Sequence, residues 1–515
     1  MLKRKGIIIL FLLFAIITVA GFVMRDQNEA DPSDQEIAIE STESSTLSSE
    51  ALAEIERVEE EKRLAEEAAE KAKAEAEAAE AQRIKEEMIR DNTYFIKVGG
   101  TPIYKEPDIG SEQVGKRLGK SSVFVEEMIT DEAGEIAFMK IKESFDVNET
   151  LGFISATAVE KTLEPFISRK YEDVDYAPFA KNDLTTYGPS EGVRAIFVTG
   201  NSARGPRMDE LITLIEETQL NAVVIDVKDD NGYLLFKSEA AKLYNPEAYE
   251  QYYIEDMEAF VNKLKSKDIY MIARIVTFKS PIYAKTHPER AIVYKSNNAL
   301  YSDGDRLIWA SPHDRVLWDY NIAVAKEAAE YGFDEIQFDY VRFPAIANRN
   351  AMDYRNESGE SQTAAIQSFV KTAYQALDEY GIAISADVFG WAASAIDDVG
   401  IGQHWEAISN VVDIISPMMY PSHYGPGNFG LSVPDAFPYE TIDRSVKEAL
   451  ERNRNLQTPG RIRPWIQDFT ATWVNGYIRY GAKEVKAQID ALEANGITEY
   501  LVWNAGNFYS ENAFK

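Results

Sequence analysis

The sequence predicts an α/β protein whose main domain, residues 190–515, is a (β/α)8 TIM barrel. First, eight short apolar runs in this region are typical of buried strands. Second, amphipathic segments such as residues 207–219 and 482–496 separate them, as alternating strand–helix units require. Third, "VTGNSARG" (198–205) lacks the glycine spacing of a phosphate loop, which disfavours the alternative of an open doubly wound sheet. The predicted strands are residues 193–200, 222–229, 269–278, 335–343, 382–390, 412–420, 461–469 and 499–506.

The N-terminus predicts a membrane anchor. Lys3, Arg4 and Lys5 precede residues 6–24, an uncharged apolar run about as long as a membrane-spanning helix. Acidic residues follow this run, so the positive-inside rule predicts a cytoplasmic N-terminus and an extracytoplasmic body. We therefore expect residues 1–25 to be a signal-anchor of a single-pass cell-membrane protein. A cleaved signal peptide, which would make the protein secreted, is the alternative.

Two segments are expected between the anchor and the first domain. Residues 26–50 are acidic, rich in Ser and almost free of large apolar groups, which predicts a disordered linker. Residues 51–90 are mostly Ala, Glu and Lys, which predicts a helical stalk. Its early apolar positions do not continue as a heptad, so a coiled coil along the stalk is not a firm expectation.

Residues 91–162 predict a small all-β domain, because short alternating runs are broken by Gly, Pro and Asp. The segments "IYKEP", "VGKRLGKSSVFV" and "LGFISATAV" resemble bacterial SH3-like domains. That resemblance implies a cell-wall peptide as ligand, and a spacer without a ligand is the alternative. Residues 163–189 are expected to link this domain to the barrel.

Composition excludes several kinds of site. The chain has 515 residues and a formal net charge of −31, which argues against nucleic acid as a partner. It has no Cys and only four His, so thiolate chemistry is excluded and a His-rich metal centre is not expected. We expect no metal and no cofactor. A Ca²⁺ loop at "DVKDDNG" (226–232) is an alternative, but this loop lacks the bidentate Glu, and a turn is the simpler interpretation.

The fourth predicted strand carries an acid in an otherwise apolar run, "DEIQFDYVRFP". Side chains alternate along a strand. Ile336, Phe338 and Tyr340 suit the side that faces the helices, so Gln337 and Asp339 should point into the barrel.

The same alternation points two further aspartates inward, Asp226 on the second strand and Asp387 on the fifth. Active sites of such barrels form at the carboxyl ends of the strands, where all three acids lie. For each aspartate alone, the alternative is a structural ion pair, with Arg274 or Arg342 as partner. Convergence of all three favours a working site.

Aromatic and amide side chains follow the same strand ends. Aromatic rings can stack on sugar faces, and amides and carboxylates can bind hydroxyl groups; each aromatic taken singly is more often part of the core. The candidate substrate-binding residues are Asp226, Arg342, Trp391, Tyr420, His423, Trp465, Gln467, Trp503 and Asn504.

Five segments together resemble a bacterial family of glycosyl hydrolase domains whose substrate is not established. They are "GVRAIFVTGNSARG", "NAVVIDVKDDNGYLLF", "DEIQFDYVRFP", "SADVFGW" and "ISPMMYPSHY". The resemblance implies a TIM barrel with glycoside hydrolase chemistry. In related barrels the acid that ends strand 4 is commonly catalytic, which carries over to Asp339. The strand-5 position often holds an acid/base Glu, and here the shorter Asp387 occupies it.

The resulting prediction is an extracytoplasmic glycoside hydrolase, anchored in the membrane, that acts on a cell-wall or surface polysaccharide. Asp339 is expected as nucleophile or charge stabiliser and Asp387 as acid/base, although these roles could be reversed. Asp226 is expected as a supporting acid, and Arg342 is expected to fix a loop or a carboxylate. Neighbouring strands lie roughly 4.8 Å apart, so the two catalytic carboxyls should be spaced as in retaining enzymes. The alternative is a catalytically inactive carbohydrate-binding or scaffold protein of the cell envelope.

Overall fold

The computed structural model divides the chain into two compact units, with the boundary between residues 161 and 162. It describes residues 78–85, 87–97, 101–117, 121–161, 168–184 and 188–515, and residues 71, 73 and 76. The expected anchor, the expected acidic linker and the first part of the expected stalk lie outside the described residues. Within the described part, no helix combines the length and the apolar character that a membrane span needs.

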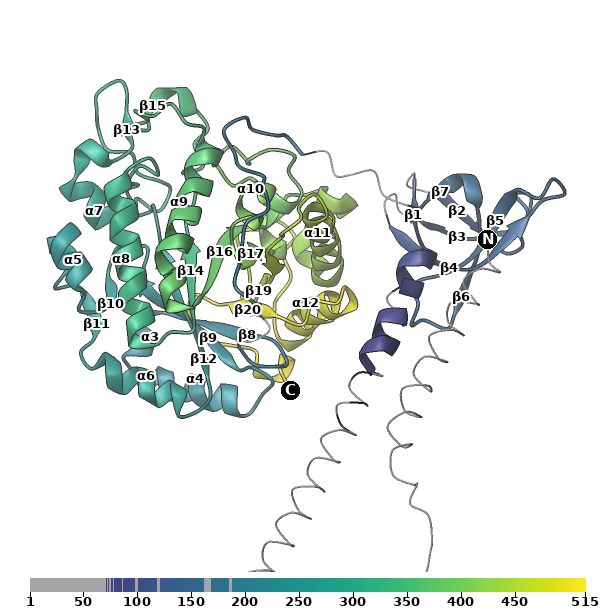
Figure 1. The fold of residues 1–515 in the computed structure, drawn as a ribbon, viewed down its shortest axis with the longest axis horizontal. Helices are drawn as coiled ribbons and strands as arrows, with labels where there is room; N and C mark the ends of the chain where they lie inside the picture. Colours follow the sequence, from purple (N-terminus) through teal and green to yellow (C-terminus); the bar gives the residue numbers. More distant parts are fainter. Residues whose placement is uncertain are drawn as a thin grey trace, which may run out of the picture. The chain divides into compact units, whose positions relative to one another are not determined.

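The first unit is a small all-β domain that follows a helix (Figure 1). Its seven strands form one sheet in the order β3-β2-β6-β5-β4-β1-β7, and its described residues from 71 to 92 are helical, as expected of the end of the stalk. The all-β character is confirmed, whereas the likeness to SH3 domains stays a prediction. The strands are β1 Thr93–Ile96, β2 Thr101–Tyr104, β3 Gln113–Arg117, β4 Ser122–Thr130, β5 Ile136–Lys142, β6 Thr150–Ser155 and β7 Val159–Glu160.

The second unit is a closed barrel of eight parallel strands, and each predicted strand contributes to it. β8 pairs with both β20 and β9, which closes the sheet and excludes the open doubly wound alternative. The seventh run is interrupted at Pro464, which has no N–H for the ladder. The strands are β8 Arg194–Val198, β9 Ala222–Lys228, β12 Tyr270–Val276, β14 Glu335–Asp339, β16 Ala383–Phe389, β17 Ile414–Met418, β18 Arg461–Ile462 with β19 Trp465–Gln467, and β20 Tyr500–Trp503.

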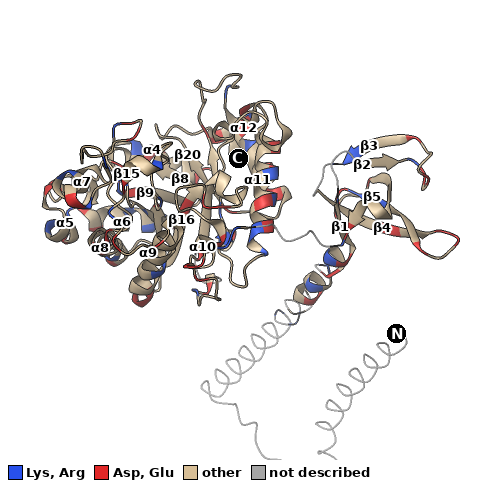
Figure 2. Ribbon diagram, turned by 90° about the horizontal axis from the view of Figure 1, so that it is seen from above, with Lys and Arg blue, Asp and Glu red and all other residues tan. Residues whose placement is uncertain are grey.

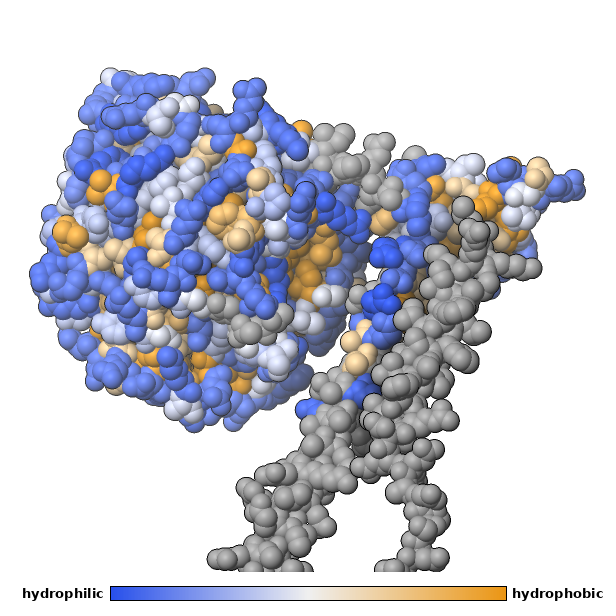
Figure 3. Space-filling view, viewed as in Figure 1, coloured by the Kyte–Doolittle hydropathy of each residue, from blue (hydrophilic) through white to orange (hydrophobic). Residues whose placement is uncertain are grey.

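Helices surround this barrel (Figure 1). The longer ones are α4 Arg207–Glu216, α6 Met257–Lys265, α8 Arg315–Tyr331, α9 Gln362–Leu377, α11 Pro438–Asn453 and α12 Ala482–Ala494, and the shorter ones are α3 Gly200–Ala203, α5 Glu239–Tyr244, α7 Pro281–Thr286 and α10 Trp405–Ser409. Short strands extend the connections: β10 Leu234–Phe236 and β11 Tyr252–Ile254 continue the sheet from β9, and β13 Val293–Tyr294 pairs with β15 Met352–Asp353. Charges of both signs are scattered over the outer helices (Figure 2), and the face in Figure 3 is mostly hydrophilic.

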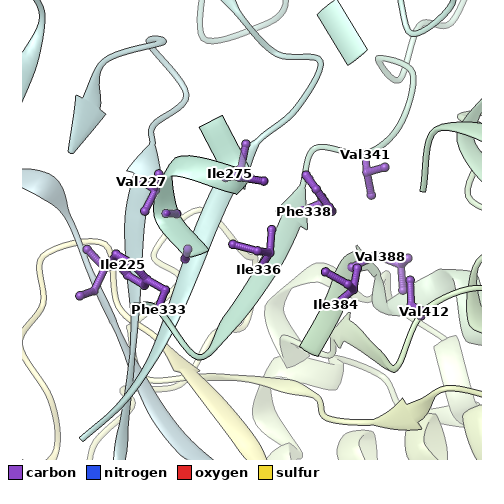
Figure 4. Packing of buried hydrophobic residues seen from close by; sticks show 14 of the residues in the cluster. Ile225, Val227, Ile275, Phe333, Ile336, Phe338, Val341, Ile384, Val388 and Val412 are labelled. Carbon is purple, nitrogen blue, oxygen red and sulfur yellow. The ribbon is translucent and has the colours of Figure 1, made fainter. Parts of the chain in front are cut away.

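Strand alternation separates two apolar cores. The outer core lies between strands and helices, and Figure 4 shows Ile336 and Phe338 of β14 beside Ile384 and Val388 of β16 in it. The inner core fills the barrel with side chains of the opposite parity, such as Val224 of β9. The predicted inward and outward directions of the side chains on these strands are therefore confirmed, because a shift by one residue would exchange the two cores.

Residues 168–184, expected to be a linker, pack on the barrel instead. Val174 is buried against Ala364 of α9 and Ala407 of α10. The Lys181 amino group donates to the Ser409 carbonyl at 2.7 Å. An apolar side chain and polar groups with buried partners hold this segment on the unit, so it does not behave as a solvated connection.

Candidate active site

The carboxyl ends of three barrel strands bring the three predicted aspartates together inside the barrel. Asp226 lies near the end of β9, Asp339 ends β14 and Asp387 lies near the end of β16. All three are buried. Phe338 pairs with Ala386 across β14 and β16, so Asp339 and Asp387 each lie one residue beyond a matched pair.

Arg274 of β12 lies between two of these acids and binds both. Its Nε donates to Asp339 Oδ2 at 3.0 Å and its Nη2 to the same oxygen at 2.5 Å, while its Nη1 donates to Asp226. Burial raises the pKa of Asp226 to about 7, and the opposing effect of Arg274 is smaller. The ion pair with Arg274, considered as an alternative role for these acids, is therefore present for two of them.

Asp387 has a different environment. Its Oδ1 accepts a hydrogen bond from Trp465 Nε1 at 2.8 Å, whereas its Oδ2 is buried without a partner among the described residues. Burial raises the pKa of Asp387 well above its ordinary value, and the charge of Asp339 raises it further. Asp387 therefore holds its proton more tightly than an ordinary aspartate, which suits a general acid.

Asp339 and Asp387 both line a pocket of about 390 Å³ at the barrel mouth. Arg274 also reaches its wall. Most of the predicted substrate-binding residues line it as well, namely Arg342, Trp391, Tyr420, His423, Trp465 and Trp503. The predicted convergence of acids and aromatic rings at one mouth is therefore observed.

Three predicted binding residues do not line this pocket. Asp226 lies behind Arg274. The Gln467 side chain donates to Asp435 and Phe469 and accepts from the Ser422 amide, and the Asn504 amide donates to the carbonyls of Asp468 and Phe508. These bonds hold the loops around the mouth, and direct sugar contacts of Asp226, Gln467 and Asn504 stay a prediction.

Tyr340 was expected to face the helices; it packs against the outer core, but it also lines the pocket. The strand ends at Asp339, and Tyr340 takes a left-handed backbone conformation with φ of 49°. This conformation is uncommon for a residue other than glycine and breaks the alternation on which the expectation rested. A strained residue directly after an active-site acid is the kind of position where backbone strain serves function.

Sequence reasoning also missed Phe389, Met418 and Phe469, which line the pocket. A signal for two of them was available, because Phe389 follows the inward Asp387 by two residues and Phe469 follows Gln467 by two. Alternation continued beyond the strand end would have placed both on the inner side.

The loop considered as a Ca²⁺ site is a turn. Asp229 Oδ1 accepts the backbone N–H groups of Asn231, Gly232 and Tyr233, and Oδ2 accepts the Tyr253 hydroxyl at 2.8 Å. The carboxylate is thereby committed to protein donors. Among the described residues, no three His, Cys, Asp or Glu side chains are grouped as metal ligands.

Comparison with known proteins identifies the family. Residues 195–509 match the family described as "Putative glycosyl hydrolase domain". The chain belongs to this family. The predicted resemblance is therefore confirmed for the barrel, and the family places it among the glycoside hydrolases, which cleave O-glycosidic bonds.

Solved structures similar to the chain include other glycoside hydrolase domains. The PgaB (BpsB) domain from Bordetella bronchiseptica is 11% identical, with 61% of this chain and 94% of that chain covered and a TM-score of 0.43. A variant of the PelA domain from Pseudomonas aeruginosa is 14% identical, with 62% and 97% covered and a TM-score of 0.36. A hypothetical protein from Ruminiclostridium thermocellum is 32% identical, with 38% and 97% covered and a TM-score of 0.34. No curated protein matches the chain.

Proposed function

We propose that the barrel hydrolyses a glycosidic bond of a polysaccharide, with Asp387 as acid/base and Asp339 as nucleophile. The observation that carries this proposal is the contrast between the two carboxyls of one pocket. Asp387 has a raised pKa and a buried oxygen without a partner among the described residues, whereas Arg274 balances the charge of Asp339. A carboxyl that holds its proton tightly can act as the proton donor, and a carboxylate beside a cation can act as the anion of the same reaction.

In the first step Asp387 gives its proton to the glycosidic oxygen while Asp339 attacks the anomeric carbon, so the leaving sugar departs as an alcohol. In the second step the ionised Asp387 takes a proton from water, and the resulting hydroxide displaces Asp339 from the sugar. The two acids lie on adjacent strands. Adjacent strands are roughly 4.8 Å apart, so we expect the two carboxyls to be close together. This spacing supports retention, because inverting enzymes separate their carboxyls by about 6.5–9.5 Å.

Aromatic rings on several loops support a sugar chain as substrate. Trp391, which lines the pocket, is 42% exposed, and Trp473 is 67% exposed. Trp473 stacks on Phe469, another lining residue, at a centroid distance of 6.0 Å. A row of rings that continues from the pocket to the surface suits more than one sugar residue.

We further propose that this enzyme works outside the cytoplasmic membrane on a cell-wall or surface glycan. The support is the uncharged run at residues 6–24 after three basic residues. The all-β domain is proposed to bind wall peptide, on the strength of its sequence resemblance alone.

The test is hydrolysis by the full chain of a panel of wall polysaccharides and aryl glycosides. Asp387→Asn and Asp339→Asn should each lower kcat by about 10²- to 10⁴-fold. Asp413→Asn is the matched control. Asp413 is a buried aspartate at the amino end of β17, outside the pocket, and it binds Asn182 and Tyr374. Near-normal turnover by either site variant would disprove the two-carboxylate mechanism. Binding without hydrolysis across the panel would favour the scaffold alternative.

A further inference from the structure

We propose that the pocket selects a sugar that carries a carboxylate, and that Arg342 is the residue that binds this carboxylate. The inference rests on the proposed function, since it names the substrate class of the same pocket. Its basis is an arginine that is buried in the pocket wall with no acidic partner among the described residues.

Arg342 lies three residues beyond Asp339 and is 9% exposed. It lines the pocket beside the two catalytic acids. Its Nη1 donates to the Phe343 carbonyl at 3.0 Å, which uses one of the five N–H donors of a guanidinium. Across the described residues, no carboxylate lies within 4.0 Å of it. Four donors of a buried cation are therefore free of protein hydrogen bonds in the described part of the chain.

The other buried arginines show what this chain normally does with such a charge. Arg274 binds Asp226 and Asp339, Arg452 binds Glu406, and Arg463 binds Glu335 and Glu499. A buried cation is costly unless it is paired and hydrogen-bonded. Arg342 departs from this pattern in the wall of a pocket, where a ligand could supply the missing partner.

The two buried lysines near the barrel mouth are compensated in other ways. Lys279 lies 3.6 Å from each of three aspartates. Lys228 donates to Asn321 Oδ1, and burial lowers its pKa to about 7, so it can release its proton. An arginine keeps its charge under all ordinary conditions. Arg342 therefore presents a permanent positive charge to the pocket.

Aromatic rings hold the guanidinium in a fixed orientation. Its central carbon lies 4.7 Å from the ring centre of Trp309, 5.0 Å from that of Tyr340 and 4.6 Å from that of Phe389. Ring faces attract a cation but do not accept its N–H groups in strong hydrogen bonds. They leave a rigid fork of donors, the arrangement that matches two oxygens of a planar carboxylate.

A neutral sugar could accept some of these hydrogen bonds through its hydroxyls, but it would leave the charge uncompensated. Asp339 and Asp303 attract Arg342 over longer distances. The oxygens of Asp339 bind Arg274 and the Tyr340 amide, and Asp303 Oδ2 accepts from Trp309 and lies 3.6 Å from Lys279. A ligand carboxylate would both accept hydrogen bonds from the guanidinium and balance its charge. It could belong to a uronic acid ring or to an acid attached to the sugar through an ether.

The experiment measures binding to the full chain through its tryptophan fluorescence, because Trp391, Trp465 and Trp503 line the pocket. The probes are glucuronate, galacturonate, N-acetylmuramate, glucose 6-phosphate, and the neutral sugars glucose, galactose and N-acetylglucosamine. At least one carboxylated sugar should bind about tenfold tighter than its neutral counterpart, and its methyl ester should lose that preference. The two uronates and N-acetylmuramate distinguish a ring carboxylate from an ether-linked one.

Arg342→Gln should reduce this preference to about onefold, because it lowers the affinity for the carboxylated sugar more than the affinity for the neutral one. The control is Arg315→Gln, because Arg315 also stacks on an aromatic ring, that of Trp318 at 3.6 Å, but lies outside this pocket. It should keep the full preference.

The proposal is overturned if no carboxylated sugar is preferred, if only the phosphate is preferred, or if Arg342→Gln keeps the preference. Should Arg342→Gln fail to fold, the wild-type comparison of acid with methyl ester still decides. A carboxylate preference without hydrolysis of any glycan would refute the proposed function and leave this inference standing.

Discussion

The two ends of the barrel interior hold ion clusters of nearly the same composition. At the amino end of the strands, Arg463 lies between Glu335 and Glu499. At the carboxyl end, Arg274 lies between Asp226 and Asp339. The strand β14 contributes to both, through its first and its last residue.

The two clusters differ in how many of their carboxylate oxygens have hydrogen-bond partners. Both oxygens of Glu335 accept hydrogen bonds from Arg463, and Ser385 and Tyr270 donate to them as well. At the carboxyl end, Asp387 adds a third carboxyl, one oxygen of which has no partner in the described part of the chain, and the cluster opens on the pocket. A buried ion pair is thus not in itself evidence of function; the informative feature is a buried polar group without a partner, facing a cavity.

The largest effect that would test this comparison is on stability, from Glu335→Gln at the amino end. It leaves Arg463 with one acid, and breaking a buried pair costs about 3–5 kcal/mol of the free energy of unfolding. Urea denaturation of the full chain, followed for the barrel transition, measures this loss. Activity per folded molecule should stay unchanged.

Glu239→Gln is the matched control for this variant, because Glu239 pairs with Lys242 while 72% exposed. This variant should lose less than about 1 kcal/mol of the free energy of unfolding. If Glu335→Gln were equally mild, the amino-end cluster would not be the structural one.

Much of this architecture could be predicted from the sequence, because strand alternation is a local property. The inward direction of Asp226, Asp339 and Asp387 followed from the apolar residues on either side of each. Which acid pairs with Arg274 depends on the register between β9, β12 and β14, which no single strand encodes.

Predictions failed where the chain leaves a regular element. Tyr340 turns into the pocket because of its left-handed conformation, which nothing in the alternation of β14 indicates. Gln467 was assigned to sugar binding because it lies in the seventh predicted strand, among the groups at the strand ends, but its amide donates to Asp435, 32 positions earlier in the chain. Contacts between distant loops of this kind require the fold.

A second, smaller effect is the pH-dependent contribution of the carboxyl-end cluster to the stability of the protein. The raised pKa of Asp387 means that the folded state binds this proton more tightly than the unfolded state, whose Asp titrates near pH ~4. Stability is therefore lost as pH rises from the unfolded toward the folded pKa. Asp387→Asn removes this loss, so its Tm should exceed that of the wild type at pH 7.

The gain should shrink as pH falls below ~4, because the wild-type side chain is then protonated in both states. Thermal melts of both proteins across this range measure it. A variant that is less stable than the wild type at pH 7 would place Asp387 among the structural acids, like Glu335.

The smallest effect is expected midway between the clusters, at Gln337. This residue is fully buried on β14 between Glu335 and Asp339; its Nε2 lies 3.4 Å from Ser416 Oγ, and its Oε1 has no partner among the described residues. Because this hydrogen bond is long, Gln337→Met should change the free energy of unfolding by no more than about 1 kcal/mol and kcat/KM by no more than about twofold. The matched control, Gln488→Met, should cost about 1–3 kcal/mol, because the Gln488 side chain binds both the N–H and the carbonyl of Gln467. If Gln337→Met instead lowered both stability and turnover strongly, the two clusters would form one coupled network, and the division into a structural end and a working end would fail.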